Sequence, residues 1–292
     1  MYTITEGYMP YLGYQTYFRI ADGGDKTPII LLHGGPGSTH NYFELLDRIA
    51  DTGRKVIMYD QLGCGKSYLD GHPELWKPDT WIDELISLRE YLHLDHVHLL
   101  GQSWGGMLEI AYLIDRKPEG IASIILSSTL SSSSLWAHEQ HRLISFMSEE
   151  DQNAIAYAEK NNAWNDPAYL KANDHFMKLH CSDIRDTDPE CLRREKRSGT
   201  EAYLYAWGPN EYNPTGTLKN FEYTDRLHEI HVPALIMSGT NDLCTPLIAK
   251  TMYDHLNDAK WELFDGARHM CFAEQTDHYC DVLSTWLTEH DQ

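Results

Sequence analysis

The sequence has little positive charge and no long hydrophobic run. Its 292 residues carry 24 lysines and arginines against 44 aspartates and glutamates, which gives a formal net charge of −20. Such a negative surface argues against nucleic acid and anionic membranes as partners, and it favours cationic substrate groups. No apolar stretch approaches the roughly 20 residues that a membrane-spanning helix requires. We therefore expect a protein with no nucleic-acid partner and no membrane span.

The sequence also lacks paired cysteines and a signal peptide. Its six cysteines form no C-x-x-C pair, which fits reduced thiols better than a disulfide framework. Residues 1–6, MYTITE, have neither the basic start nor the apolar core of a secretory signal. These features predict a cytoplasmic location.

The chain length and a hydrophobic content of 42% allow one large domain with an insertion, and they are compatible with a homo-oligomer.

Ser103 lies in the most informative motif of the chain. Residues 101–105 read GQSWG and stand between the apolar run 97–100 and a segment with apolar residues at helical spacing. Gly-x-Ser-x-Gly between a strand and a helix is the nucleophile elbow of α/β-hydrolases, where glycines leave room for a sharp turn that exposes the serine hydroxyl. The helix is expected to stop at Lys117-Pro118. Ser103 is therefore the candidate nucleophile.

Two backbone N–H groups are candidates for an oxyanion hole. Residues 33–37, HGGPG, follow the apolar run 28–32, which is typical of a buried parallel strand. A glycine-rich loop at this point can turn an N–H toward a developing oxyanion, and we assign this donor to Gly35. The second donor in such folds is the N–H of the residue after the nucleophile, here Trp104, at the positive end of the predicted helix.

The acid and the histidine of a catalytic triad are expected later in the chain, in that order. Asp242 follows the strand-like run 232–237, and His269 follows the run 261–264. Both positions are loops just beyond a predicted strand, and the order Ser103, Asp242, His269 is the hydrolase order. The rival acids are Asp60, Asp225 and Asp265.

The other histidines and Asp60 are interpreted as structural or surface groups. Of 16 histidines, only His269 is selected by strand, loop and order. None of His33, His180, His228, His231 and His255 is interpreted as having a second ligand at metal spacing. Asp60 and Cys64 lie in residues 60–67, DQLGCGKS, which we interpret as a structural turn beside the sheet. No metal site is predicted.

The alternation of strands and helices predicts an α/β-hydrolase fold with a mostly parallel central sheet. The alternation is clear up to about residue 128 and resumes at about residue 223, so we place the two parts of the hydrolase core at 1–128 and 223–292. Residues 129–222 are predicted to form a helical cap, inserted before the strand that bears the triad acid. Its helices are expected over 135–147, 149–161 and 167–180. The cap is rich in aromatic residues, and we expect some of them to line a small apolar pocket. They include Trp136, Tyr157, Trp164, Tyr169, Phe176, Tyr203, Tyr205 and Trp207.

Several motifs together resemble the proline iminopeptidases, especially those of lactic acid bacteria. They are HGGPG at 33–37, DQLGCGKS at 60–67, GQSWGG at 101–106, WGPNEY at 207–212 and GTNDLCTP at 239–246. The similarity covers nearly the whole chain, although amino-acid amidases and some other hydrolases share HGGPG and GQSWGG. The resemblance implies release of proline from small peptides with a free N-terminal proline, with no metal or organic cofactor.

The resemblance also implies how the site residues act. Ser103 would attack the proline carbonyl, His269 would accept and return the proton, and Asp242 would orient the imidazole. Glu211 matches the family's amine-binding glutamate, which holds the substrate's charged amine by a charge-assisted hydrogen bond. The substrate-binding residue is therefore expected to be Glu211.

One position departs from the family pattern. Some relatives have a second amine-binding glutamate directly after the triad aspartate, where this chain has Leu243. Glu109, on the helix after the elbow, is interpreted as a helix-surface or paired carboxylate and is not assigned to the site.

Two other functions are compatible with the same fold. An amino-acid amidase or esterase would use the same triad on a different acyl group. A non-catalytic α/β-hydrolase that binds a ligand under its cap would be expected to have a damaged triad or oxyanion loop, and here both are intact in the sequence. Dehalogenases and epoxide hydrolases are disfavoured because they place an acid where this chain has Ser103.

Overall fold

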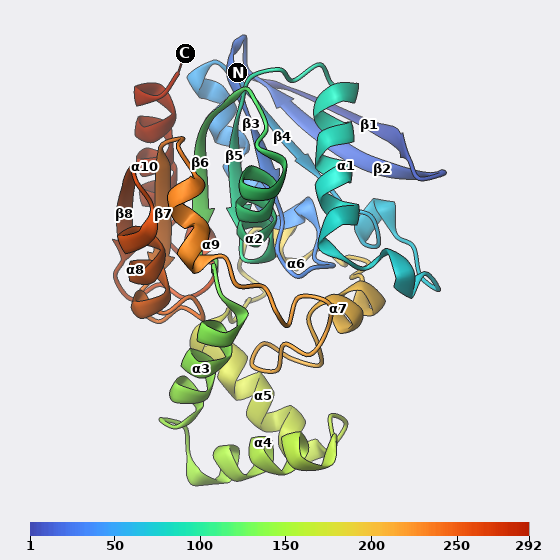
Figure 1. Ribbon diagram of the computed structural model, residues 1–292, viewed down its shortest axis with the longest axis vertical. Coiled ribbons are helices and arrows are strands. Elements are labelled where there is room, and N and C mark those ends of the chain that lie inside the picture. Colours follow the sequence, from blue (N-terminus) through green and yellow to red (C-terminus); the bar gives the residue numbers. More distant parts are fainter. Residues whose placement is uncertain (292) are drawn as a thin grey trace.

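A sheet of eight strands forms the centre of the computed structural model, which describes residues 1–291 (Figure 1). The strands are β1 (Thr3–Tyr11), β2 (Tyr14–Asp22), β3 (Lys26–Leu32), β4 (Arg54–Tyr59), β5 (Val97–Gln102), β6 (Ile121–Ser127), β7 (Ala234–Gly239) and β8 (Ala259–Phe264). They lie in the order β1-β2-β4-β3-β5-β6-β7-β8. The pairs β1–β2 and β2–β4 are antiparallel and all later pairs are parallel, so the predicted mostly parallel sheet is confirmed.

Helices connect the strands and form the insertion. The α-helices are α1 (Pro78–Tyr91), α2 (Trp104–Ala111), α3 (Ser133–Ile144), α4 (Glu149–Asn161), α5 (Pro167–His180), α6 (Glu190–Arg193), α7 (Thr200–Ala206), α8 (Pro246–His255), α9 (Cys271–Glu274) and α10 (Thr276–Glu289). The 3-10 segments are η1 (His40–Thr52), η2 (Gly65–Ser67), η3 (Pro73–Leu75) and η5 (Thr224–Glu229), and η4 (Tyr112–Arg116) is a π-helical turn after α2. Lys117 adopts a left-handed conformation (φ 48°) before Pro118, so the predicted stop is confirmed.

The sheet separates two hydrophobic cores. Ile30 and Leu32 of β3 pack with side chains of α1 and α2, whereas Ile29 and Leu31 pack with side chains of η1 and α10. All four are at most 1% exposed. A parallel strand that is covered on both faces needs apolar residues at consecutive positions, and this explains the unbroken hydrophobic run of the sequence.

The N-terminal hairpin is a feature that the sequence analysis did not identify. β1 and β2 are joined at Leu12-Gly13, both with positive φ (48° and 83°). β1 is the edge strand, and its first four residues are exposed. Only its end is covered, by burial of Met9 and Tyr11 in the core, so the hydrophobic alternation of the strand is short and weak.

The insertion between β6 and β7 projects from the carboxyl ends of the parallel strands (Figure 1). α4 and α5 have the predicted bounds, whereas α3 begins two residues earlier and ends three residues earlier than expected. The early start follows from Ser132, whose side chain accepts a hydrogen bond from the Leu135 N–H at 3.0 Å and caps the helix. At the neck of the insertion Ser132 forms a bridge with Glu222, and the Tyr223 N–H donates to the Ser131 carbonyl at 2.7 Å.

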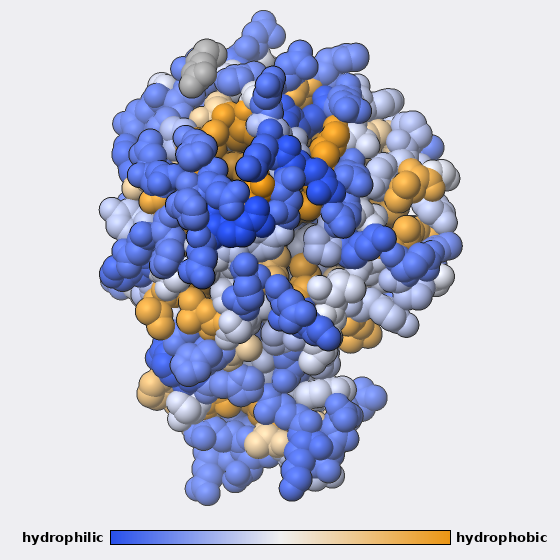
Figure 2. All heavy atoms as spheres, in the orientation of Figure 1, coloured by the Kyte–Doolittle hydropathy of each residue, from blue (hydrophilic) through white to orange (hydrophobic). Residues whose placement is uncertain are grey.

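The visible surface is largely hydrophilic (Figure 2). Figure 2 shows that hydrophilic side chains cover most of the visible face, over both the sheet region and the narrower end formed by α3, α4 and α5. In residues 1–291, no helix has the length and apolar character needed to cross a lipid bilayer.

Candidate active site

Ser103 occupies a strained turn between β5 and α2. Its backbone has φ 56° and ψ −120°, and such a conformation costs a non-glycine residue on the order of 1–3 kcal/mol. The turn is possible because its neighbours lack side chains. A Cβ on Gly101 would lie 2.3 Å from the carbonyl carbon of Gly105, and a Cβ on Gly105 would lie 1.9 Å from the carbonyl oxygen of Leu32. The predicted elbow is therefore present, with Ser103 at its tip.

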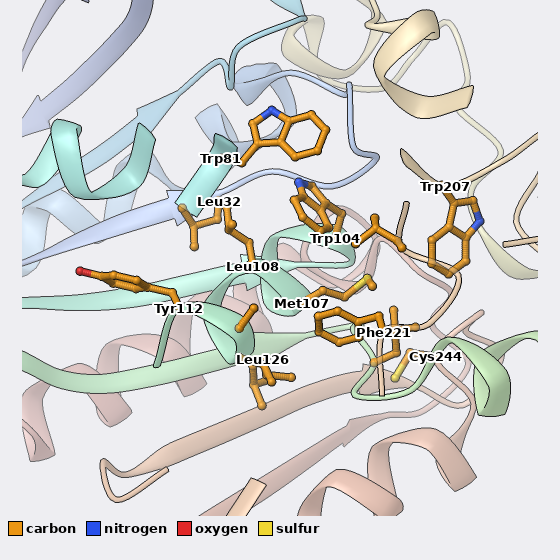
Figure 3. Close-up of a cluster of buried hydrophobic side chains, with 14 of the residues drawn as sticks. Leu32, Trp81, Trp104, Met107, Leu108, Tyr112, Leu126, Trp207, Phe221 and Cys244 are labelled. Carbon is orange, nitrogen blue, oxygen red and sulfur yellow. The ribbon is translucent and has the colours of Figure 1, made fainter. Parts of the chain in front are cut away.

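Trp104 is the first residue of α2, so its N–H has no acceptor within the helix. The indole is buried and fixes the start of the helix. Its Nε1 donates to Gln61 Oε1 at 2.8 Å, and its ring meets Trp81 edge-on at a centroid distance of 5.2 Å. Figure 3 shows the ring among buried side chains that include Trp81 and Met107. This packing holds the backbone N–H of Trp104 beside the nucleophile.

Gly35 lies in the loop after β3, with φ 113° and a cis peptide bond to Pro36. The fully buried His33 holds this loop: its Nε2 accepts from the Gln61 N–H at 3.0 Å, so its Nδ1 donates to the Gly34 carbonyl at 2.9 Å. Burial lowers the pKa of His33 to about 4. The imidazole is therefore neutral at neutral pH, in agreement with the structural role predicted for it.

Asp242 and His269 come from the loops after β7 and β8 and meet at the same edge of the sheet. His269 Nδ1 lies 2.7 Å from Asp242 Oδ1. The Asp242 carboxylate also accepts hydrogen bonds from Ser128 Oγ (2.6 Å), the Gly239 N–H (3.1 Å) and the Cys244 N–H (2.8 Å). This arrangement fixes the carboxylate and places the proton on Nδ1, which leaves Nε2 of His269 available as a base.

A cavity of about 240 Å³ brings the candidate residues together. Ser103, Gly35, His269 and Glu211 all line it. The other lining residues are Gly34, Ser38, Tyr42, Gln102, Cys181, Ser182, Ile184, Cys191, Leu192, Lys196 and Met270. Among the contacts of residues 1–291, the Ser103 hydroxyl makes no hydrogen bond to His269; this bond often tightens only when substrate binds. A larger hollow of about 570 Å³ lies along β8 and α10 and contains none of the candidate residues.

Glu211 enters the cavity from the loop after α7. Its Oε1 accepts a hydrogen bond from the Tyr203 hydroxyl at 2.8 Å, and its backbone carbonyl accepts one from Trp136 Nε1 at 2.8 Å. Burial raises the pKa of the Glu211 carboxyl, while nearby His269 and the Tyr203 hydrogen bond act in the opposite direction. The prediction that placed Glu211 near the nucleophile is therefore supported by its position.

The expectation that aromatic cap residues line the pocket is wrong for this cavity. Within the described chain its apolar walls are Ile184, Leu192 and Met270, with the core residue Tyr42. Trp136 packs edge-on against Trp207 and Trp164 against Tyr169, whereas Tyr157 and Tyr205 are exposed at the surface. Trp136 also meets the His269 ring edge-on at a centroid distance of 5.9 Å.

Leu243 leaves the amine site with one carboxylate. The side chain of Leu243 is fully buried in the hydrophobic core, and its carbonyl accepts from Gln140 Nε2 at 2.7 Å. Among residues 1–291, Glu211 is the one carboxylate that lines the cavity.

Glu109 is not a surface or paired carboxylate, which corrects the sequence-based interpretation. All eight residues of α2 are buried, and in residues 1–291 neither carboxyl oxygen of Glu109 has a hydrogen-bond partner. Burial raises the pKa of this carboxyl well above its usual range. Because the helix is enclosed on all sides, its polar positions are buried along with its apolar ones.

Asp60 has the structural role that was predicted for it. Its carboxylate accepts hydrogen bonds from the His40 N–H (2.8 Å), His40 Nδ1 (2.7 Å) and the Lys66 N–H (2.8 Å). Burial acts to raise the pKa of Asp60, but the hydrogen bonds from His40 and Lys66 outweigh it and lower the pKa. Asp60 therefore holds the turn 60–67 beside the sheet.

The chemistry available at the cavity is nucleophilic catalysis. It offers a serine hydroxyl, an imidazole oriented by a carboxylate, and a further carboxylate at Glu211. In the part of the chain that the structure describes, no group of three or more His, Cys, Asp or Glu side chains is placed to hold a metal ion. A serine activated by histidine needs no metal for acyl transfer.

Known proteins match this chain over its full length. The family described as the alpha/beta hydrolase fold matches residues 27–276. A proline iminopeptidase of Clostridioides difficile (strain 630) is 57% identical over 291 residues, covering 99% of both chains. One of Lactobacillus helveticus is 58% identical over 292 residues, again covering 99% of both. This chain belongs to the proline iminopeptidase family.

Similarity to a solved structure supports the same family membership. The crystal structure of a proline iminopeptidase from Mycobacterium smegmatis matches with a TM-score of 0.86 at 29% identity and covers 98% of each chain. The α/β-hydrolase fold and the resemblance to proline iminopeptidases, both expected from the motifs, are confirmed.

Proposed function

We propose that this protein is a serine aminopeptidase that releases N-terminal proline from small peptides. The observation that carries the proposal is the cavity in which Ser103, the His269–Asp242 pair and the Glu211 carboxylate meet. A nucleophile beside an amine-binding carboxylate is what an aminopeptidase requires, because the charged amine stands next to the scissile carbonyl.

Acyl transfer follows from the positions of the side chains. The Ser103 hydroxyl attacks the proline carbonyl carbon while His269 takes its proton, and Asp242 stabilises the resulting imidazolium. The oxyanion is held by the N–H groups of Gly35 and Trp104. When the tetrahedral intermediate collapses, His269 gives its proton to the leaving amine and a prolyl ester of Ser103 remains. Water, activated by His269, then hydrolyses the ester.

Glu211 supplies recognition of the free amine. Within residues 1–291 its carboxylate accepts a hydrogen bond from the Tyr203 hydroxyl alone, since the Trp136 contact goes to the backbone. The remaining acceptor positions are free for a substrate ammonium, and an ion pair in a cavity shielded from water is stronger than one at the surface.

Residues 129–222 act as a cap in this proposal. They contribute Glu211 and the wall residues Ile184 and Leu192 to the cavity, and they project over the strand ends that bear the triad (Figure 1).

We also place the reaction in the cytoplasm. In residues 1–291 all six cysteines are free thiols, which suits a reducing compartment.

The test compares prolyl anilide, alanyl anilide and N-acetylprolyl anilide as substrates of the purified protein. We expect the highest kcat/KM with prolyl anilide and poor hydrolysis of the N-acetyl compound, which has no charged amine for Glu211. An amino-acid amidase of broad specificity would cleave the alanyl and prolyl substrates equally well. Equal hydrolysis of the free and acetylated prolyl substrates would contradict the assignment as an aminopeptidase.

A further inference from the structure

Lys196 places a positive charge at the cavity that holds the nucleophile. It lies in the loop between α6 and α7, and in residues 1–291 it is the one lysine or arginine that lines this cavity. The residue is solvent-exposed, which puts it at the cavity mouth. Its Nζ lies 5.8 Å from the centroid of the Tyr42 ring, and Tyr42 is itself a wall of the cavity.

Among residues 1–291, Lys196 has no carboxylate partner, whereas nearby Arg194 has two. Arg194 pairs with both Glu44 and Glu190, and the Arg197 guanidinium lies 3.3 Å from the ring centroid of Tyr68. Lys196 makes no ion pair and no hydrogen bond with any of residues 1–291. In a protein of net charge −20, an unpaired ammonium that lines the cavity of the nucleophile is available for an anionic group of the substrate.

The backbone around Lys196 is held against the core. The Gly65 N–H donates to the Arg197 carbonyl at 2.7 Å, and the Gly199 N–H donates to the Gly37 carbonyl at 2.8 Å. On the other side of Lys196, Arg194 Nη1 lies 2.7 Å from Glu44 Oε1. These contacts fix the position from which the lysine side chain reaches the cavity.

The charged residues that line the cavity complement a short zwitterion. A dipeptide carries an ammonium at one end and a carboxylate at the other. The cavity offers a carboxylate at Glu211 and an ammonium at Lys196, so its charges complement both ends of such a zwitterion.

We propose that Lys196 binds the C-terminal carboxylate of a dipeptide whose N-terminal proline is held by Glu211. This inference rests on the proposed function and narrows its substrate class to dipeptides that begin with proline. Lys196 is a specificity-determining residue in this account and takes no part in proton transfer.

The experiment measures kcat/KM on prolyl-glycine, prolyl-glycine amide and prolyl anilide. The amide has the same length as the dipeptide but no carboxylate, and the anilide tests the acyl-transfer machinery alone. We expect Lys196→Met to lower kcat/KM on prolyl-glycine by about tenfold, the effect of a hydrogen bond to a charged group. The other two substrates should be little affected. Lys196→Arg should retain the preference because a guanidinium also binds carboxylate.

Lys160→Met is the matched control, since it removes an exposed lysine from the last turn of α4. It should leave all three values unchanged. An equal loss on the three substrates in Lys196→Met, or a wild type that prefers the amide to the dipeptide, would overturn the inference. Failure of the wild type to cleave prolyl anilide would instead refute the proposed function, so the two failures are distinguishable.

Discussion

The hydrolase core and the cap contribute to the cavity in different ways. Core residues stand at strand ends and are tightly fixed: Ser103 by a turn that only glycine neighbours allow, and Asp242 by four hydrogen bonds. The cap residues Glu211 and Lys196 come from loops. Within residues 1–291 the Glu211 carboxylate accepts one hydrogen bond, from Tyr203, and the Lys196 ammonium has no ionic partner. In the proposed function the sheet carries the chemistry, whereas the cap leaves charges free to recognise the ends of the substrate.

Removing the nucleophile should have the largest effect, because it abolishes the contribution of the core altogether. Ser103→Ala is expected to lower kcat at least about 10⁴-fold on a free-amine anilide and on a neutral ester alike. The measurement is steady-state turnover of protein whose folding is checked by circular dichroism. Near-normal turnover in a preparation free of wild-type enzyme would show that Ser103 is not the nucleophile.

Changing the triad acid comes next. Asp242→Asn is expected to lower kcat about 10⁴-fold, because an amide cannot accept the His269 Nδ1 proton in the way a carboxylate does and the imidazole takes the wrong tautomer. As a core variant it should affect a prolyl anilide and a neutral ester equally. Loss on the anilide alone would mean that Asp242 contacts the substrate amine.

Glu211→Gln should have a smaller and selective effect. The glutamine keeps the size of the side chain and can still accept from Tyr203, but it leaves the substrate ammonium without a counter-charge. Such losses cost about 2–5 kcal/mol, roughly a thirty-fold to several-thousand-fold fall in kcat/KM on prolyl anilide. A neutral ester should be much less affected.

The raised pKa of Glu211 gives this contrast a pH dependence. Only the ionised carboxylate holds the ammonium, so kcat/KM on the anilide should fall as the pH falls through the raised pKa of Glu211. A pH effect on the acyl-transfer step that both substrates share cancels in the ratio of anilide to ester. The ratio is therefore expected to decrease toward acid pH in the wild type and to be flat in Glu211→Gln.

Replacing Glu109 should change the free energy of unfolding and leave kcat and KM unchanged. Its pKa is raised in the folded protein, so the folded state keeps a proton that the unfolded state releases above about pH 4.3. Unfolding is then favoured increasingly as the pH rises. Glu109→Met, which removes the unpartnered carboxyl, is expected to gain about 1–3 kcal/mol at pH 8 and less at pH 5.

Urea unfolding at the two pH values measures this difference, with Glu90→Met on the exposed face of α1 as the control. A gain that is the same at pH 5 and pH 8 would show that the Glu109 carboxyl does not stay protonated in the folded protein.

The catalytic elements could be predicted because their signals are local. The GQSWG turn forces its own backbone geometry, and Asp242 and His269 each follow a short apolar strand, so the parallel sheet brings them to one edge. The bounds of α4 and α5 could also be predicted from the sequence, because Ser148 and Asp166 are clear N-caps.

Other features depend on how distant segments pack, and the sequence does not contain that information locally. Glu109 lies among residues whose spacing is that of an amphipathic helix, but α2 is covered on every side. Lys196 stands in a run of charged residues that is typical of a solvated loop, and only the contacts of Arg197 and Gly199 with the core bring it to the cavity. The apolar wall residues Ile184, Leu192 and Met270 likewise belong to no motif.

The central claim, that the core performs the chemistry and the cap selects the free amine, is tested most directly by one ratio. It is kcat/KM on prolyl anilide divided by kcat/KM on a small neutral ester, measured for the wild type, Asp242→Asn and Glu211→Gln. The account predicts that Asp242→Asn leaves the ratio near its wild-type value, although both rates collapse, and that Glu211→Gln lowers it at least about thirty-fold. A Glu211→Gln variant that loses both activities equally would contradict the account.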